Sequence, residues 1–173
     1  MSFDRKERII LIGPMGAGKS SIGKSLALVS EKAFLDVDEE IVRYAKMSIP
    51  DIFATKGEAE FRNIESLVLE KCLKYEAVIA TGGGIIGREI NRKLLKENGL
   101  VVYLYADVDT QYLRTSHDNN RPMLNVDDRR QRLLDIFTKR DPLYKECADI
   151  TIDSGKMDIH NCVETIVEKI RES

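Results

Sequence analysis

The sequence predicts an α/β protein built on a parallel β-sheet that helices cover on both faces. Five short apolar segments alternate along the chain with longer amphipathic segments. Strands that are apolar throughout are typical of parallel sheets, because helices bury both of their faces. A glycine-rich loop, Gly13–Ser20, directly follows the first apolar segment and is typical of a sheet that binds phosphate.

The predicted strands are the five apolar segments, Ile9–Ile12, Ala33–Leu35, Val78–Ala80, Leu100–Tyr105 and Asp149–Ile152. The last helical pattern spaces its apolar residues by three and four, as one face of a helix requires: Ile159, Val163, Ile166, Val167 and Ile170. Between the second and third strands, residues about 38–65 hold two helical patterns, more than a crossover needs. We interpret this segment, and the polar segment about 117–126, as excursions over the ligand site of a single domain covering residues 1–173.

The composition excludes several classes of protein. Of 173 residues, 43% are hydrophobic and 32% are charged, which is ordinary for one globular domain. The net charge of −2 argues against a general binder of nucleic acid or of membrane surfaces, since both need a basic field. The first apolar segment is too short for a signal peptide or a membrane span. The three cysteines, Cys72, Cys147 and Cys162, are odd in number and widely spaced, which favours buried free thiols. We expect a cytoplasmic protein, with a monomer as the default.

Two overlapping segments match the phosphate-loop pattern G-x-x-x-x-G-K-[ST], Gly13–Ser20 and Gly18–Ser25. Only the first follows a predicted strand and opens a predicted helix, as the motif requires. Five residues along a helix move Lys24 about 7.5 Å down the axis and roughly 140° around it from Lys19, so Lys24 points away from the phosphates. We therefore expect Lys19 to contact the β- and γ-phosphates and Ser20 to bind Mg²⁺.

The backbone of the first match supplies further nucleotide contacts. Its glycines let N–H groups turn toward a phosphate, and the helix N-terminus adds positive potential. The predicted nucleotide-binding residues here are Gly16, Ala17, Gly18, Lys19, Ser20 and Ser21.

Two carboxylates follow the second predicted strand, in LDVDEEI. Asp36 and Asp38 are two residues apart, which places both on one side of an extended backbone. One carboxylate could hold Mg²⁺, directly or through water, and the other could accept a proton from an acceptor hydroxyl. The alternative is that Asp38 only caps the following helix. Asp107, at the end of VVYLYAD, has no such companion, and we interpret it as a helix N-cap.

Glycines and arginines complete the set of candidate site residues. Thr81–Gly84, TGGG, ends the third predicted strand, where glycines would let a substrate approach the backbone closely. Arg62, Arg121 and Arg140 lie in or beside the two excursions. Each alone is more often a solvated surface residue. Together they form a positive group suited to carboxylates and phosphates.

These features favour a small-molecule kinase over other phosphate binders. Thr138–Asp141 fits the guanine-reading pattern [NT]-K-x-D, but it ends a helical pattern, and the chain contains no D-x-x-G. A GTPase switch is therefore disfavoured. A gluconate- or nucleoside-monophosphate-type kinase and a non-catalytic nucleotide-binding module stay open as alternatives.

The motifs occur along nearly the whole chain in the order GPMGAGKS, LDVDEEI, GEAEFR, ATGGG, RPML and RDPLY. In this order they resemble the shikimate kinase family. The resemblance implies an adenylate-kinase-like P-loop fold, a three-layer α/β/α arrangement around a five-stranded parallel sheet, with a substrate-binding excursion and a lid. It also implies transfer of the ATP γ-phosphoryl group to the 3-hydroxyl of shikimate with Mg²⁺, giving shikimate 3-phosphate and ADP.

The resemblance also implies which residues contact shikimate. By position, Asp38, Arg62, Gly83 and Arg140 resemble the shikimate contacts of the family. Asp38 would orient and deprotonate the hydroxyl, while Arg62 and Arg140 would bind the carboxylate. The flanking residues of the same turn, Gly82 and Gly84, are included in the predicted substrate site.

Further roles follow by position on the nucleotide side. Arg121 resembles the lid arginine that closes over the transferring phosphate, and Arg114 resembles the arginine that stacks on adenine. Asp36 and Ser20 would organise Mg²⁺. The segment after the last strand, IDSGKMD, is expected to pass near the adenine.

Overall fold

The computed structural model describes residues 7–116 and 128–172. Within these ranges five parallel strands form one sheet in the order β2-β3-β1-β4-β5. The strands are β1 Ile9–Ile12, β2 Ala33–Asp36, β3 Ala77–Ala80, β4 Leu100–Tyr105 and β5 Ile150–Asp153. The α-helices are α1 Lys19–Ser30, α2 Val37–Ala45, α3 Ile49–Cys72, α4 Glu89–Asn98, α5 Val108–Thr115, α6 Arg129–Cys147 and α7 Ile159–Glu172, and a short 3-10 helix, η2, spans Ile85–Gly87.

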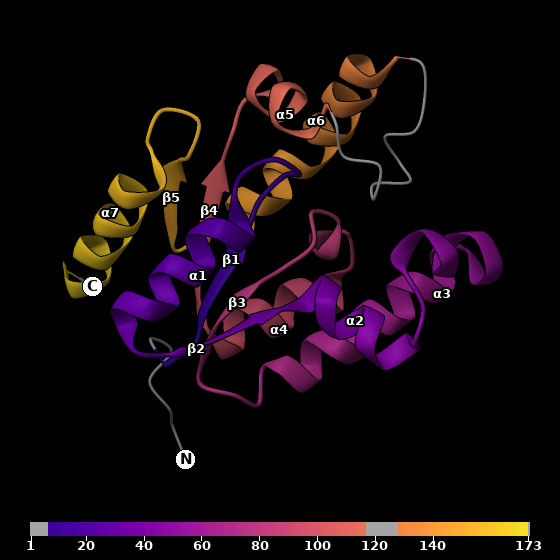
Figure 1. The fold of residues 1–173 in the computed structure, drawn as a ribbon, viewed down its shortest axis with the longest axis horizontal. Helices are drawn as coiled ribbons and strands as arrows, with labels where there is room; N and C mark the ends of the chain where they lie inside the picture. The colour runs from indigo at the N-terminus through magenta and orange to yellow at the C-terminus, as the bar shows by residue number, and fades with distance from the viewer. Residues whose placement is uncertain (1–6, 117–127, 173) are drawn as a thin grey trace.

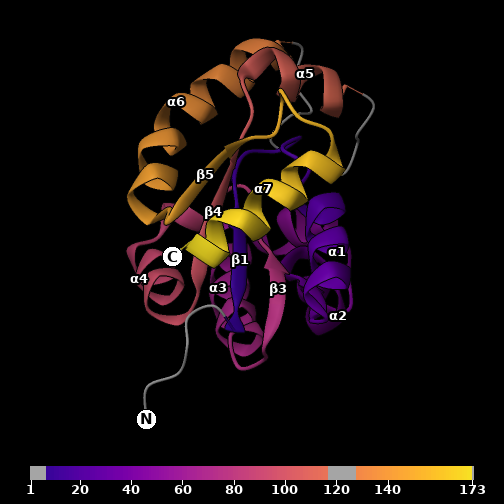
Figure 2. The ribbon, with the colours of Figure 1, turned by 90° about the vertical axis from the view of Figure 1, so that its left-hand side faces the viewer.

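Helices cover both faces of the sheet, as the sequence predicts (Figures 1 and 2). Successive side chains of a strand point to opposite faces, and β1 separates the two cores accordingly. Ile10 and Ile12 belong to the core that includes α3, α4 and α6, whereas Ile9 and Leu11 belong to the core with α1 and α7. All four side chains are buried, so the three-layer arrangement follows from one short apolar strand.

The two edge strands are less completely buried than the three inner strands. In β2 Ala33 is exposed, and Phe34 and Leu35 are only half-buried. In β5 Thr151 is exposed. Each of these strands has a neighbour on one side only, so helices and strands cover less of its surface.

The predicted excursion between β2 and β3 is formed by α2 and α3. Ser48 caps α3 by accepting a hydrogen bond from Asp51 N, and the helix then continues to Cys72, beyond the predicted end of the excursion. Gly57, with φ 85° and ψ 168°, interrupts the helical conformation within α3. In Figure 1 the first part of α3 extends away from the sheet at the right of the view.

The parallel arrangement brings the carboxyl ends of all strands to one edge of the sheet, where ligands of such folds bind. There β1 leads into the phosphate loop, β2 ends at Asp36, and β3 leads into Thr81–Gly84. The predicted lid, residues about 117–126, lies outside the described residues. In the described part of the chain, no helix is both long and apolar enough to cross a membrane.

Candidate active site

The phosphate loop leads from β1 into α1 as the sequence predicts. Gly18 is the N-cap of α1, with φ 88° and ψ 22°, a left-handed conformation that favours glycine. The helix begins at Lys19, whose ammonium donates to the carbonyl oxygens of Gly13 at 2.6 Å and Pro14 at 2.8 Å. The lysine side chain therefore folds over its own loop.

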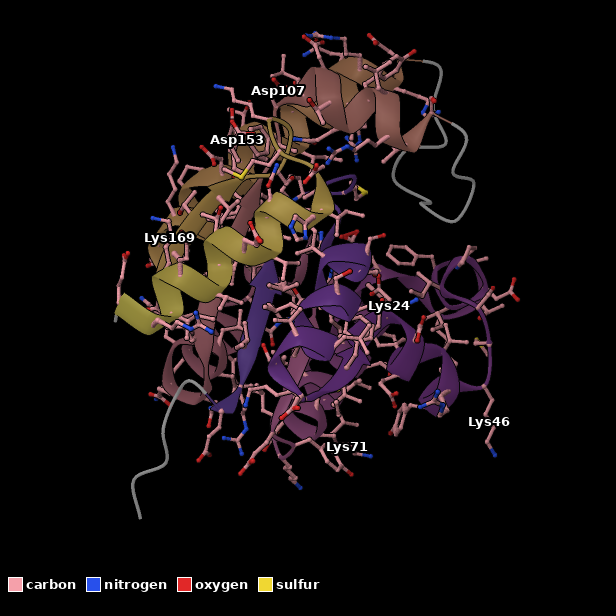
Figure 3. All side chains as sticks on the ribbon, turned by 60° about the vertical axis from the view of Figure 1, so that its left-hand side comes forward. Lys24, Lys46, Lys71, Asp107, Asp153 and Lys169 are labelled. Atoms are coloured by element: carbon pink, nitrogen blue, oxygen red, sulfur yellow. The ribbon has the colours of Figure 1, made fainter. Side chains whose placement is uncertain are left out.

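The second motif match lies on the surface of α1. Lys24 is exposed, and its Nζ lies 6.0 Å from the centroid of the Phe34 ring (Figure 3). It does not line the cavity at the phosphate loop. Lys19 lines that cavity.

A cavity of about 250 Å³ lies at the carboxyl edge of the sheet. Its walls come from the phosphate loop, the ends of β2 and β3, the start of α2, and α5. The lining residues are Gly16, Gly18, Lys19, Ser20, Ser21, Asp36, Asp38, Thr81, Gly82, Gly83 and Arg114. Most of the predicted nucleotide and substrate residues therefore share one cavity.

The two aspartates line this cavity, but not with the predicted geometry. Asp36 ends β2, and α2 begins at the next residue, so Asp38 lies in the first helical turn. The prediction that both carboxylates share one side of an extended strand is wrong for this reason. The helix cap is Asp36, whose Oδ1 accepts from the backbone N of Asp38 at 2.9 Å and of Glu39 at 3.3 Å. The alternative that Asp38 caps the helix is also wrong.

The other oxygen of Asp36 faces the phosphate loop. Ser20 Oγ donates to Asp36 Oδ2 at 2.8 Å. This oxygen pair fits Mg²⁺, which prefers a few protein oxygens and completes its ligands with water and phosphate. Within residues 7–116 and 128–172, no group of three or more His, Cys, Asp or Glu side chains is placed to hold a metal ion.

Two predicted arginines meet at the glycine turn that follows β3. A Cβ atom placed on Gly84 would lie 2.5 Å from Nη2 of Arg62 and 2.8 Å from Nη2 of Arg140. The Arg62 side chain is only 16% exposed, and Arg140 is half-buried. The alternative that they are solvated surface residues is therefore wrong for this pair.

The pair sits in an unusual electrostatic environment. Burial lowers the pKa of Arg140, and the neighbouring Arg62 guanidinium lowers that pKa further. Arg62 donates to Glu65 Oε1 at 2.9 Å, and the Glu65 side chain is 1% exposed. Burial raises the pKa of Glu65, and the Arg62 charge opposes that rise. Two guanidinium groups therefore meet at one glycine turn, an arrangement suited to binding a carboxylate.

Comparison with known proteins identifies the family to which this site belongs. A family model described as shikimate kinase matches residues 15–171. This chain belongs to the shikimate kinase family. The family consists of ATP-dependent kinases that use Mg²⁺.

Individual relatives are similar in sequence to this chain along most of their length. A shikimate kinase of Thioalkalivibrio sulfidiphilus is 48% identical over 91% of this chain and 84% of the relative. A solved shikimate kinase from Acinetobacter baumannii, in complex with shikimate, is 43% identical with a TM-score of 0.94, covering 98% of this chain and 96% of that chain. A shikimate kinase structure from Aquifex aeolicus is 33% identical with a TM-score of 0.83, covering 95% and 96%. The fold predicted for a shikimate kinase is therefore confirmed.

Arg114, predicted to contact adenine in a shikimate kinase, bridges two loops. It donates to the carbonyl oxygen of Gly16 at 2.9 Å and to that of Ser154, directly after β5, at 3.0 Å. The guanidinium therefore joins the phosphate loop to the segment that the sequence places near the adenine. At the same end of the molecule, Asp107 caps α5 by accepting from Thr110 N at 2.8 Å, which confirms its prediction as an N-cap (Figure 3).

Sequence reasoning missed two residues of this shikimate kinase site, Glu65 and Tyr144. Glu65 lies three residues after Arg62 on α3, and Tyr144 lies four residues after Arg140 on α6. Residues with these spacings share a helix face, so the spacing was an available signal. Arg121 lies outside the described residues.

Proposed function

We propose that the chain transfers the γ-phosphoryl group of ATP to the 3-hydroxyl of shikimate, giving shikimate 3-phosphate and ADP. The observation that carries this proposal is the meeting of Arg62 and Arg140 at Gly84, next to the cavity that Asp38 and the phosphate loop line. Two guanidinium groups suit the carboxylate of the acceptor, because their N–H groups match carboxylate oxygens in pairs. A hydroxyl of the same molecule would then lie between Asp38 and the nucleotide.

We propose that Asp38 orients the acceptor hydroxyl and takes its proton. A Cβ atom on Gly82 would lie 2.9 Å from Asp38 Oδ1, so only glycine leaves the carboxylate this close to the turn. The position of Asp38 in the first turn of α2 also keeps the negative charge favourable, since a helix N-terminus stabilises anions. A carboxylate in this position can accept the proton of the hydroxyl.

We propose that the remaining chemistry is charge neutralisation. Phosphoryl transfer needs positioning and electrostatic stabilisation more than covalent chemistry. Lys19 would turn from its loop carbonyls to the β- and γ-phosphates, and Arg121 would close over the transferring group from the lid at about 117–126. Mg²⁺, held by Ser20 and Asp36 with the phosphates, would supply further positive charge. The core, the excursion and the lid would together form a single kinase domain.

A coupled assay with ATP, Mg²⁺ and a panel of acceptors tests this proposal. We expect ADP release with shikimate and none with gluconate or a nucleoside monophosphate. Turnover of gluconate or a nucleotide without shikimate would assign a different kinase with the same fold. Binding of ATP without ADP release for any acceptor would point to a non-catalytic nucleotide-binding module.

The carboxylate-binding role has its own test. Arg62→Ala and Arg140→Ala are each expected to raise the KM for shikimate by roughly tenfold or more, because each removes a charge-assisted hydrogen-bonding group. The KM for ATP should change little. If the two variants weakened only ATP binding, the assignment of these arginines to shikimate would be wrong.

We further propose that the protein is a cytoplasmic monomer. Its three cysteines are free and buried, which suits a reducing compartment. Light scattering in solution tests the oligomeric state: a monomer has a mass of 19.6 kDa, and a mass of twice that value would overturn it.

A further inference from the structure

Tyr144 is a fully buried tyrosine whose hydroxyl lies at the glycine turn where Arg62 and Arg140 meet. Its side chain is 0% exposed, and its hydroxyl donates to the carbonyl oxygen of Gly83 at 2.5 Å. The Arg140 guanidinium lies at the same turn, where a Cβ atom on Gly83 would be 3.5 Å from Arg140 Nη1. The hydroxyl of Tyr144 and the charge of Arg140 are close enough to interact electrostatically. The Tyr144 hydroxyl is therefore bonded to the turn that follows β3, beside the arginine of α6.

Helix geometry makes this connection possible. Arg140 and Tyr144 are four residues apart on α6, so both project from one helix face toward the turn. The Tyr144 ring packs against the buried ring of Tyr103 on β4, with the centroids 4.9 Å apart. Packing at the ring and the hydrogen bond at the hydroxyl hold the side chain in place.

The hydroxyl of Tyr144 constrains the place where Arg140 lies. The polar hydroxyl beside the guanidinium favours one direction of a long side chain that would otherwise be free to move. The bond to Gly83 fixes a whole peptide unit, because the carbonyl of Gly83 and the N–H of Gly84 lie in one plane and point in opposite directions. Gly84 is also the residue against which Arg62 and Arg140 meet.

We propose that Tyr144 is a positioning residue for recognition of the substrate carboxylate, acting through Arg140 and the Gly83–Gly84 peptide. It does not touch the substrate and takes no part in proton transfer. This inference rests on the proposed function, in which Arg140 binds the carboxylate. It adds that selectivity for a carboxylate depends on the hydroxyl of Tyr144, which lies beside Arg140 and does not reach the substrate.

The test compares Tyr144→Phe with Tyr103→Phe, and shikimate with its uncharged methyl ester. Both substitutions remove one buried tyrosine hydroxyl, but that of Tyr103 donates to Asp141 Oδ1 at 2.6 Å and not to Gly83. We expect Tyr144→Phe to raise the KM for shikimate by roughly tenfold, the effect of losing one buried hydrogen bond, while kcat and the KM for ATP change less than about twofold. The KM for the methyl ester should hardly change, and Tyr103→Phe should behave as the wild type.

A purely structural role for Tyr144 predicts another result. It would weaken the binding of shikimate and of the methyl ester alike, or it would lower kcat and also change the KM values for both shikimate and ATP. Either outcome overturns the proposal. An unchanged KM for shikimate in Tyr144→Phe overturns it as well. If Tyr144→Phe is too unstable for the assay, calorimetric binding of the two ligands in the cold gives the same comparison.

Arg140→Ala separates this inference from the proposed function. If Arg140→Ala does not reduce the preference for shikimate over the methyl ester, the arginine does not bind the carboxylate, and the proposed function of the site fails. If Arg140→Ala reduces the preference and Tyr144→Phe does not, only the role of Tyr144 fails. In an Arg140→Ala background, Tyr144→Phe is expected to cause no further loss of preference, because it acts through the arginine.

Discussion

Asp38 is the residue on which turnover is expected to depend most. Replacing it with asparagine keeps the size of the side chain and removes its ability to take a proton. We expect Asp38→Asn to lower kcat by roughly 10²–10⁴-fold, the usual contribution of a general base, with ATP binding largely preserved. Steady-state kinetics and nucleotide titration measure the two effects. Glu39→Gln changes the exposed neighbour on α2 and is the control. A near-normal kcat in Asp38→Asn would mean that Asp38 does not act as the general base.

Lys19 and Lys24 test which match to the motif binds phosphate. The ammonium of Lys19 lies over the phosphate loop, while Lys24 is exposed and lies near Phe34. We expect Lys19→Ala to abolish most activity and Lys24→Ala to leave kcat and the KM for ATP nearly unchanged. Both variants replace a lysine by alanine in the first two turns of α1, so each controls for the other. Similar losses in both would contradict the choice of the first match.

The turn after β3 has space for the ends of the Arg62 and Arg140 side chains because Gly84 has no side chain of its own. Gly84 has φ −94° and ψ 4°, which alanine also adopts, so any effect of Gly84→Ala comes from its methyl group. That methyl would overlap the ends of Arg62 and Arg140, which are flexible and would move aside. We expect a KM for shikimate raised by roughly tenfold with unfolding free energy within about 1 kcal/mol of the wild type.

Gly87→Ala is the matched control for this variant. It lies in the same segment, and a Cβ atom there would meet nothing within 4 Å. Its kinetics should match those of the wild type. If Gly84→Ala also left the KM for shikimate unchanged, shikimate binding would not depend on the absence of a side chain at position 84.

The start of α2 combines a helix cap with the metal site, and Asp36 supplies one oxygen to each. Asparagine and aspartate are equally good N-caps, whereas alanine costs about 1 kcal/mol. We expect Asp36→Ala to lower the free energy of urea unfolding by about that amount and Asp36→Asn to lower it little. Both should raise the Mg²⁺ concentration needed for half-maximal activity, because both remove the charge.

The two outcomes at Asp36 are independent of each other. Equal losses of stability in the asparagine and alanine variants would mean that the Oδ1 contacts do not cap α2. An unchanged Mg²⁺ requirement in both variants would mean that the Asp36 carboxylate does not help to bind Mg²⁺.

For the whole molecule, the fold could be predicted from local patterns because strands and phosphate loops carry strong local signals. The bounds of β1 and β4 agree residue for residue with the apolar segments. The geometry at Asp38 could not be predicted from spacing, because no turn residue separates β2 from α2. The spacing of Tyr144 from Arg140 indicates a shared helix face, but its bond to the carbonyl of Gly83, far away in the sequence, could not be predicted. Contacts of this kind depend on how α6 packs, and they leave no local pattern.

The buried thiols give a prediction for the stability of the whole molecule. Burial, with the nearby Glu40 and Asp36 carboxylates, raises the pKa of Cys72 from 9.0 to about 11. Since the folded-state pKa lies above the unfolded value, the stabilising contribution of the neutral thiol is complete below pH 9.0 and is lost as the pH rises through about 11. The free energy of unfolding should therefore fall across this window.

Cys72→Ala isolates this contribution, because lysines and tyrosines titrate alike in both proteins. Alanine leaves a cavity, so the variant should be less stable than the wild type near neutral pH. Urea unfolding at several pH values should then find the difference in free energy narrowing between pH 9.0 and about 11, since only the wild type loses the contribution of a protonated thiol. Parallel curves across this window would mean that the thiol titrates at the same pH in the folded and unfolded chains.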